Sequence, residues 1–137
     1  MASHRIWGNS NIIPVFLDTN AIFTIFEYSL NLESELTRLL GSFNIKIPVA
    51  VSQEIEIIQK RGKGKQKKLA RPALQFIKRY PIWDHPDYKN ADDALLHEAG
   101  KVNAVVFTND IDLRNRLKEN QIPRIFLRGK HQLVLEK

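Results

Sequence analysis

The sequence predicts an α/β fold in which a parallel sheet is covered by helices on both sides. Short apolar runs at residues 13–17 and 104–107 alternate with longer segments that carry apolar residues at helical spacing. Both runs are apolar throughout, as in strands that are buried on both faces. The chain of 137 residues is long enough for one domain with its own core, and it shows no internal repeat.

The first third of the chain predicts two strands separated by two helices. The strand at residues 13–17 leads into a largely apolar helix at residues 21–30. Leucines at helical spacing predict a second helix at residues 32–40, and Gly41 is a typical residue to end it. The second strand is predicted at residues 43–48, where a proline ends it.

The middle of the chain is rich in basic residues. A helix with an apolar stripe is predicted at residues 49–60. Residues 60–68 contain six basic residues, two glycines and no acid, which predicts a flexible, solvated loop. The next helix is predicted at residues 69–80, with Pro72 tolerated near its start. Residues 81–83 are a candidate short strand at an edge of the sheet.

The last third of the chain repeats the alternation of helix and strand. Residues 91–100 predict a helix that stops at its glycine, and residues 104–107 predict a buried strand. A helix at residues 111–120 and a strand at residues 124–127 follow. We expect a short basic tail after this last strand.

Composition and charge restrict the classes of function. The chain has no cysteine, which excludes disulfides, thiolate zinc sites and cysteine nucleophiles. No apolar run is long enough to span a membrane, so we expect no membrane partner and a cytoplasmic location. The net charge of +6 favours a polyanionic partner such as nucleic acid. We expect residues 1–11 to form a flexible arm and residues 12–137 to form one domain.

Acidic residues follow or flank several of the predicted strands. Asp18 and Asp110 come directly after apolar runs, and carboxyl ends of parallel strands meet at one edge of a sheet. Asp93 and Glu54 lie near the starts of helices that can reach this edge, and Asp112 flanks the set. Clustered carboxylates repel one another unless a cation neutralises them, and oxygen ligands suit Mg²⁺ or Mn²⁺. Such an ion supports hydrolysis of a phosphodiester.

Helix capping is the alternative interpretation of these residues. Asp, Asn and Thr are common residues at helix starts, where they accept hydrogen bonds from free backbone N–H groups. Glu54, taken alone, is typical of a solvated helix residue. Capping does not explain why acids on several separate elements converge on one edge. The residues to which capping applies are Asp18, Thr19, Asn90, Asp92, Asn109 and Asp110.

In four segments the sequence resembles the PIN domain family of metal-dependent nucleases. They are Val15-Phe16-Leu17-Asp18-Thr19-Asn20, Val51-Ser52-Gln53-Glu54-Ile55, Ala91-Asp92-Asp93-Ala94-Leu95 and Thr108-Asn109-Asp110-Ile111-Asp112-Leu113. Each segment is a weak signal alone, but their order and spacing are specific. The resemblance implies a three-layer α/β/α sandwich around a central parallel sheet. It also implies an acidic pocket that binds Mg²⁺ or Mn²⁺, and endonucleolytic hydrolysis of RNA that leaves a 5′-phosphate and a 3′-hydroxyl.

The resemblance also assigns roles to single residues. It implies that the metal-binding and catalytic acids are Asp18, Glu54, Asp93 and Asp110. Asp112 would be a further acid at the metal, while Asn20 and Thr108 would orient ligands or water. Asp93 is chosen over Asp92 because Asp-Ala-Leu matches the usual run of the family. The doubled acid leaves this choice open, and Asp92 remains a supporting residue.

Two branches of the family share these features. One is the PIN nucleases that process small-subunit ribosomal RNA, which would make the pre-ribosome a partner. The other is the VapC toxins, which act as homodimers and are silenced by a small antitoxin protein. The alternative function is a PIN-like RNA-binding or ribosome-assembly factor without catalysis. A regulatory domain of the receiver type also gathers acids at strand ends.

The basic residues are candidate contacts for the phosphate backbone of RNA. A mobile loop without a partner is the alternative interpretation of the basic stretch. The candidates are Lys60, Arg61, Lys63, Lys65, Lys67 and Lys68 in the loop, followed by Arg124, Arg128 and Lys130 near the end of the chain.

Overall fold

A six-stranded, mostly parallel sheet forms the centre of the described chain. The structure is a computed structural model that describes residues 12–137, and the arm predicted at residues 1–11 lies outside them. The strands are β1 (Ile12–Leu17), β2 (Ser42–Pro48), β3 (Ile82–Trp83), β4 (Val105–Phe107), β5 (Arg124–Arg128) and β6 (Gln132–Glu136). They lie in the order β3-β2-β1-β4-β5-β6, and β6 alone runs antiparallel to its neighbour.

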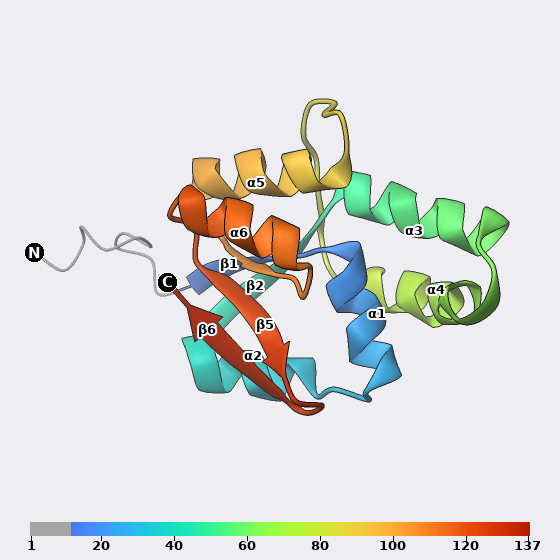
Figure 1. Cartoon of the computed structure of the whole chain (residues 1–137), viewed down its shortest axis with the longest axis horizontal. Helices are drawn as coiled ribbons and strands as arrows, with labels where there is room; N and C mark the ends of the chain where they lie inside the picture. The colour runs from blue at the N-terminus through green and yellow to red at the C-terminus, as the bar shows by residue number, and fades with distance from the viewer. Residues whose placement is uncertain (1–11) are drawn as a thin grey trace, which may run out of the picture.

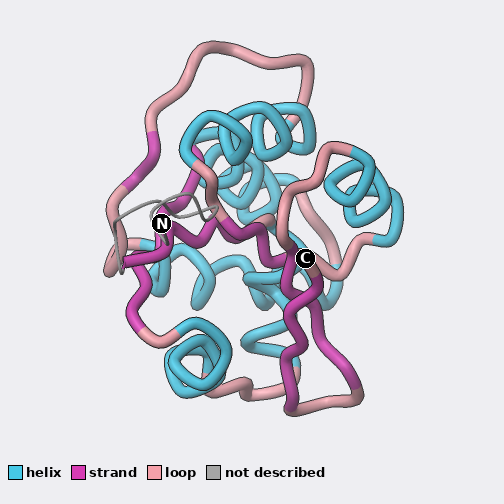
Figure 2. The backbone as a smooth tube through the Cα atoms, turned by 90° about the vertical axis from the view of Figure 1, so that its left-hand side faces the viewer, coloured by secondary structure: helices cyan, strands magenta, loops and turns pink. Residues whose placement is uncertain are grey.

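Helices cover both faces of this sheet, which confirms the predicted α/β sandwich. The helices are α1 (Thr19–Glu27), α2 (Leu32–Leu40), α3 (Val49–Arg61), α4 (Gly64–Ile77), α5 (Ala91–Val102) and α6 (Ile111–Glu119). Figure 2 shows the strands running between helices on two sides, with α5 and α6 on one side and α2 on the other. No helix among residues 12–137 is long and apolar enough to cross a membrane.

Strand β1 lies in the middle of the sheet and ends level with β4. Leu17 pairs with Phe107, and the Asp18 amide donates a hydrogen bond to the Phe107 carbonyl oxygen at 3.2 Å. Val15, Phe16 and Leu17 are fully buried, as the continuous apolar run predicts. Residues that follow the two strands are therefore neighbours at one rim of the sheet. Figure 1 shows that α1, α3, α5 and α6 all begin at this rim.

The prediction of a loop at residues 60–68 is wrong, because most of these residues are helical. Helix α3 extends to Arg61, and α4 begins at Gly64, eight residues before Pro72. Pro72 is thus an interior residue of α4 and not one near its start. Lysine and glutamine are good helix formers, and α4 packs along α3, so helix replaces loop here. We call residues 60–68 the basic arm; its tip projects from the body of the molecule in Figure 1.

The last third of the chain departs from prediction in two places. Helix α5 does not stop at Gly100 but continues to Val102, and Asn103 ends it in the left-handed conformation with φ 56°. The expected basic tail instead contains β6, which pairs with β5. Glu35 on α2 accepts a hydrogen bond from the Leu133 amide at 2.8 Å, and Arg38 donates to the Leu133 carbonyl at 2.7 Å. These contacts from a distant helix occupy both backbone polar groups of Leu133 in the edge strand.

The position of Gly100 inside α5 predicts that Gly100→Ala stabilises the protein. Glycine in a helix interior costs about 0.5–1 kcal/mol relative to alanine. A Cβ at position 100 meets only the Ile122 Cδ1 atom, at 4.0 Å. We expect a gain of about 0.5–1 kcal/mol in the free energy of unfolding, measured by urea denaturation. Gly62→Ala is the opposite control, because its Cβ would lie 2.5 Å from the Ile58 carbonyl oxygen.

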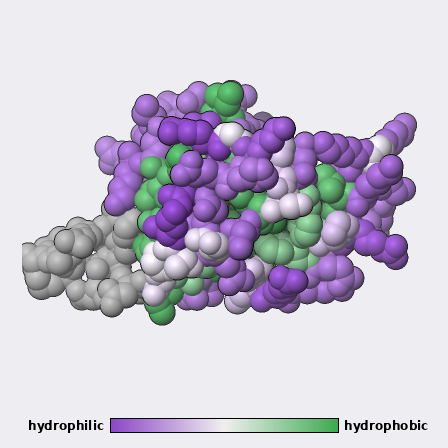
Figure 3. Space-filling view, turned by 90° about the horizontal axis from the view of Figure 1, so that it is seen from below, coloured by the Kyte–Doolittle hydropathy of each residue, from purple (hydrophilic) through white to green (hydrophobic). Residues whose placement is uncertain are grey.

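A surface hollow of about 690 Å³ lies between α1, α2 and α4. Its lining is partly apolar and includes Ile25, Phe26 and Phe76. The face drawn in Figure 3 is largely polar, with apolar patches in its middle. None of the predicted acids lines this hollow, so it is separate from the rim where β1 and β4 end.

Candidate active site

Asp18 is the buried acid of the site, with only 5% of its surface exposed. It is the N-cap of α1: the Ala21 amide donates to Asp18 Oδ1 at 2.6 Å. The other carboxylate oxygen, Oδ2, accepts a short hydrogen bond from the Thr108 hydroxyl. A carboxylate offers about four lone-pair sites, so these two bonds leave capacity for a further ligand. Capping and a role in the site are therefore compatible.

Thr108 connects Asp18 to Asp110. The Thr108 side chain is fully buried, and its Oγ1 accepts a hydrogen bond from the Asp110 amide at 3.0 Å while its hydroxyl donates to Asp18. Asp110 is the N-cap of α6, where its Oδ1 accepts from the Leu113 amide at 3.1 Å. The two strand-end acids are thus held in a fixed relation by one threonine.

The adjacent acids Asp92 and Asp93 lie in the first turn of α5 and have different surroundings. The Asp93 carboxylate accepts a hydrogen bond from Arg116 of α6 at 2.8 Å. Partial burial raises the pKa of Asp92, and the negative charges of Asp110 and Glu54 raise it further. Asp92 is therefore the member of the pair whose charge the other acids repel most clearly, whereas Asp93 is paired with a cation. Helix α5 is capped by Asn90, which accepts from the Asp93 amide at 2.9 Å.

Burial and the mutual repulsion of the acids both disfavour the charged form of Asp18. Burial raises the pKa of Asp18 to about 7, although hydrogen bonds from Thr108 and Ala21 lower it, and the charges of Asp92 and Asp110 raise it further. The positive ends of the helix dipoles of α1, α5 and α6 partly offset the negative charge. The pKa of Asp18 nevertheless remains raised, mainly because the carboxylate is buried. A nearby cation would stabilise the charged forms of these carboxylates.

Comparisons with known proteins decide the family. A family model described as a PIN-like domain matches residues 15–130. The chain belongs to the PIN-like domain family. The ribonuclease VapC4 of Methanocaldococcus jannaschii is 36% identical over 123 residues, which are 87% of this chain and 91% of that protein. The ribonuclease VapC9 of Archaeoglobus fulgidus is 24% identical over 128 residues, 93% of each chain.

Solved structures agree with the fold of a PIN-like domain. The PIN domain endonuclease Utp24 superposes with a TM-score of 0.77, 23% identity and coverage of 93% of each chain. VapBC-1 from nontypeable Haemophilus influenzae has a TM-score of 0.51, with 16% identity and coverage of 78% of this chain and 94% of the other. At these identities the likeness concerns the fold.

The chemistry of the donors in this PIN-like domain fits a divalent ion. In the described part of the chain, no three acidic or histidine side chains already converge closely enough to hold a metal. Asp18 and Asp110 are fixed by their hydrogen bonds, whereas Glu54 is exposed and Asp92 is half-buried. Within residues 12–137 no hydrogen bond holds the Glu54 or Asp92 carboxylate, so these two can turn toward an ion. Carboxylate oxygens that repel one another are the donor set that Mg²⁺ or Mn²⁺ requires.

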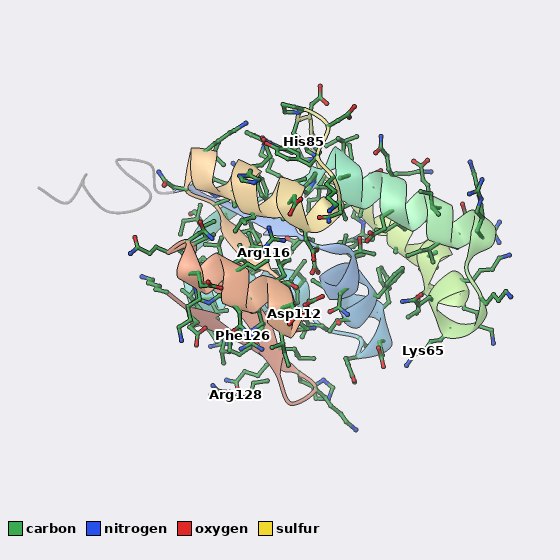
Figure 4. All side chains as sticks on the ribbon, turned by 45° about the horizontal axis from the view of Figure 1, so that its top comes forward. Lys65, His85, Asp112, Arg116, Phe126 and Arg128 are labelled. Carbon is green, nitrogen blue, oxygen red and sulfur yellow. The ribbon has the colours of Figure 1, made fainter. Side chains whose placement is uncertain are left out.

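The remaining predicted residues of the PIN-like domain lie in several places. Asn20 is exposed at the start of α1, and its carbonyl oxygen accepts from Thr24 at 2.9 Å. Asp112 is exposed in the first turn of α6, at the end of the helix nearer α1 (Figure 4). Both side chains are at the rim, yet within residues 12–137 neither one forms a hydrogen bond with Asp18.

Most of the predicted RNA contacts are exposed, but Arg124 is an exception. The basic arm, Arg128 and Lys130 face solvent. Arg124 is 1% exposed, donates to Glu136 at 2.8 Å and to the Ile122 carbonyl at 2.8 Å. Its prediction as an RNA contact is wrong, because pairing of β6 with β5 brings Glu136 over it and covers it.

Two residues of the site were not expected from the sequence. Arg116 reaches across from α6 to Asp93, as Figure 4 indicates between α5 and α6. Asn109 donates to the Thr24 hydroxyl at 2.9 Å and accepts from the Leu127 amide at 2.8 Å, which ties the strand-end loop to α1 and β5. The position of Arg116 one helical turn after Asp112 was the available signal for it. No local pattern marks Asn109, because both partners are distant in sequence.

Proposed function

We propose that this PIN-like domain is a metal-dependent endoribonuclease. The observation that carries the proposal is the buried Asp18 carboxylate, which faces the charges of Asp92 and Asp110 at one rim of the sheet. The names of the relatives, both ribonucleases, and the 36% identity to one of them support RNA as the substrate. A basic surface around an acidic site is suited to RNA, since its cations hold the phosphates.

In this proposal Asp18, Asp92 and Asp110 hold Mg²⁺ or Mn²⁺, and Glu54 holds a second ion or aligns the attacking water. When bound, the ion supplies an activated water and stabilises the leaving oxygen of the phosphodiester. Thr108 orients the Asp18 carboxylate and favours its ionised form by donating to it. We choose Asp92 over Asp93 because Asp93 is paired with Arg116. Asp112 and Asn20 are supporting residues at the rim.

Cleavage of RNA tests the activity. Purified protein is incubated with a labelled single-stranded RNA in Mg²⁺ or in Mn²⁺, and the products are separated on a sequencing gel. We expect cleavage at internal positions, with 5′-phosphate ends, that EDTA abolishes. Cleavage that persists in EDTA at the same rate would mean that the activity is not metal-dependent or belongs to a contaminant.

The basic arm is proposed to bind the phosphate backbone away from the cleavage position. Arg61 lies seven residues beyond Glu54 on α3, which places it about 10 Å farther along the helix axis. Lys65 is paired with Glu27 at 2.6 Å, whereas Lys67 and Lys68 are exposed and have no acidic partner within residues 12–137. Arg128 and Lys130 are exposed around the turn between β5 and β6 and are further candidate contacts.

Replacing Lys67 and Lys68 by Gln is expected to weaken RNA binding and its dependence on salt. Each phosphate contact to a single strand contributes about 0.7 to the slope of log affinity against log salt, so we expect the slope to fall by about 1.4. The measurement is fluorescence anisotropy of a labelled RNA at several salt concentrations. The matched control is Lys78→Gln with Lys118→Gln, which removes two exposed lysines outside the arm. Equal losses in both double variants would contradict a specific role of the arm.

The toxin role is the one that sequence similarity favours. The ribonucleases VapC4 and VapC9 match most of this chain, while the likeness to Utp24 concerns the fold. We therefore propose a small antitoxin protein as partner, a homodimer as the working form and the cytoplasm as the location. Induced expression tests the role: wild-type protein should arrest growth and Asp18→Asn should not. Processing of pre-ribosomal RNA is the second candidate role, and normal growth together with altered ribosomal RNA ends would support it.

A non-catalytic RNA-binding factor is the alternative function. It predicts that RNA binding depends on the basic arm and survives Asp18→Asn, with no cleavage by the wild type in any divalent metal. The cluster of four acids argues against it, because a factor without catalysis has no use for a repulsive charge cluster.

A further inference from the structure

Among residues 12–137, Arg116 is the one lysine or arginine that forms an ion pair with an acid of the site. Its Nη2 atom donates to Asp93 Oδ1 at 2.8 Å, and its charge lowers the pKa of Asp92 against burial and the neighbouring acids, which raise it. The side chain is 41% exposed, and within residues 12–137 the guanidinium makes no other hydrogen bond. Asp93 thus accepts a hydrogen bond from one of the five N–H donors of the guanidinium group, and the other donors stay free.

The position of Arg116 directs these free donors toward the cleavage site. Side chains of a helix tilt toward its N-terminus, and α6 begins at Asp110 in the acid cluster. Arg116 lies one turn beyond Asp112, and Figure 4 shows it in the space between α5 and α6. Its free edge therefore lies at the border between the acids and solvent, where an RNA strand must approach.

RNA that approaches four acids meets repulsion, which a bound metal offsets most strongly at the phosphate it touches. A cation beside the metal site lowers this repulsion for a neighbouring phosphate. The planar guanidinium fork matches two phosphate oxygens, and a monodentate ion pair with Asp93 leaves that fork available. The lysines of the basic arm lie on other elements, so we do not expect them to bind this neighbouring phosphate.

We propose that Arg116 binds a phosphate of the RNA beside the cleavage position, and that Asp93 positions Arg116 instead of binding metal. The inference rests on the proposed nuclease function and divides the adjacent acids between two tasks. Asp92 binds the metal, and Asp93 positions Arg116, which binds a phosphate of the RNA. A purely structural ion pair between α5 and α6 is the competing account.

RNA affinity tests the first half of the proposal. Binding of a labelled single-stranded RNA is measured by anisotropy with Ca²⁺ as the divalent ion, and gels verify that the RNA stays intact. Arg116→Gln is expected to raise the dissociation constant about tenfold, because a charge-assisted contact is lost. Arg116→Lys keeps the charge but not the fork and should give a smaller loss. Lys118→Gln removes a cation of the same helix that lies near Glu136 and should change the constant less than twofold.

Metal affinity tests the second half. Binding of Mn²⁺ is measured by calorimetry for the wild type, Asp93→Asn and Asp92→Asn. We expect Asp93→Asn to retain Mn²⁺ affinity within threefold and Asp92→Asn to lose tenfold or more. Loss of Mn²⁺ binding in Asp93→Asn would overturn the assignment of Asp93 to Arg116.

Thermal unfolding separates the proposal from a structural role. An ion pair that only joins two helices would lower the unfolding temperature in Arg116→Gln and leave RNA affinity unchanged, which would refute the proposal. Equal losses of RNA affinity in Arg116→Gln and Lys118→Gln would also refute it. If the wild type cleaves no RNA, the proposed function fails, while the binding series still decides the role of Arg116.

Discussion

Asp18→Asn is expected to abolish RNA cleavage while it stabilises the metal-free protein. Asp18 is the one acid of the site that is buried and doubly hydrogen-bonded. An amide in its place keeps the volume and can accept one of the two hydrogen bonds, but it lacks the charge that a cation needs. We expect kcat/KM to fall about a thousandfold or more. The measurement is single-turnover cleavage in Mn²⁺. Asp87→Asn, at an exposed acid before α5, is the control and should cleave like the wild type.

The gain in stability follows from the raised pKa of Asp18. This pKa is about 7 in the folded protein and 3.8 in the reference state, so the folded protein binds more protons between about pH 4 and pH 7. The stability of the wild type therefore falls as the pH rises through this window. An asparagine does not titrate, so Asp18→Asn avoids this loss.

Urea denaturation in EDTA at pH 5 and pH 8 measures the gain. In the folded protein the pKa of Asp18 is about 7, which is two units above pH 5. The advantage of Asp18→Asn over the wild type should be larger at pH 8 by up to about 2–3 kcal/mol. Mg²⁺ should then stabilise the wild type and leave the variant unchanged. If the stability difference between Asp18→Asn and the wild type is the same at pH 5 and pH 8, the pKa of Asp18 is not raised in the folded protein.

Glu98→Leu is expected to destabilise the protein by about 3 kcal/mol or more. Glu98 on α5 is 3% exposed, and three donors surround its carboxylate. Trp83 Nε1 donates to Oε1 at 2.9 Å, while the Tyr88 hydroxyl and Lys101 donate to Oε2 at 2.5 and 2.9 Å. A leucine of similar volume leaves the Trp83 and Tyr88 donors without their acceptor.

The charge of Glu98 also predicts that the stability of the protein falls at acidic pH. Burial raises its pKa, but the hydrogen bonds from Tyr88, Lys101 and Trp83 outweigh burial and lower the pKa to about 2. Because the folded pKa lies below the reference value of 4.5, this contribution is complete above about pH 4.5 and is lost as the pH falls toward 2. The wild type should thus lose its advantage over Glu98→Leu in this range.

Chemical denaturation at pH 7 and pH 3 measures both effects of Glu98→Leu. Glu119→Leu, at the exposed end of α6, is the matched control and should change stability by less than about 0.5 kcal/mol. Glu98 accepts hydrogen bonds from the segment between β3 and α5, and this segment leads to Asp92. We therefore expect Glu98→Leu to lose RNA cleavage as well as stability. A stable variant would show that this segment is held by other contacts.

The strands and the first acids of the site were predictable because their signals are local. The apolar run that ends at Leu17 needs only its own residues to be recognised as a buried strand, and Asp18 follows it directly. The sequence predicts a loop for the basic arm because glycines and a run of like charges are typical of loops. The helix propensity of its lysines and glutamine favours the helix that is found. Gly100 was mistaken for a helix stop because the residue that ends α5, Asn103, is a less common choice.

The sequence by itself determined the order of strands and helices up to β5 and the presence of acids at the ends of β1 and β4. Both follow from periodicity and from the rule that parallel strands end at one edge. Only the tertiary structure decided that Asp92 faces the acids and Asp93 faces Arg116, because adjacent helix residues point in directions about 100° apart and α6 supplies the cation. It also decided that Arg124 is buried, since β6 covers it through pairing that no local pattern contains.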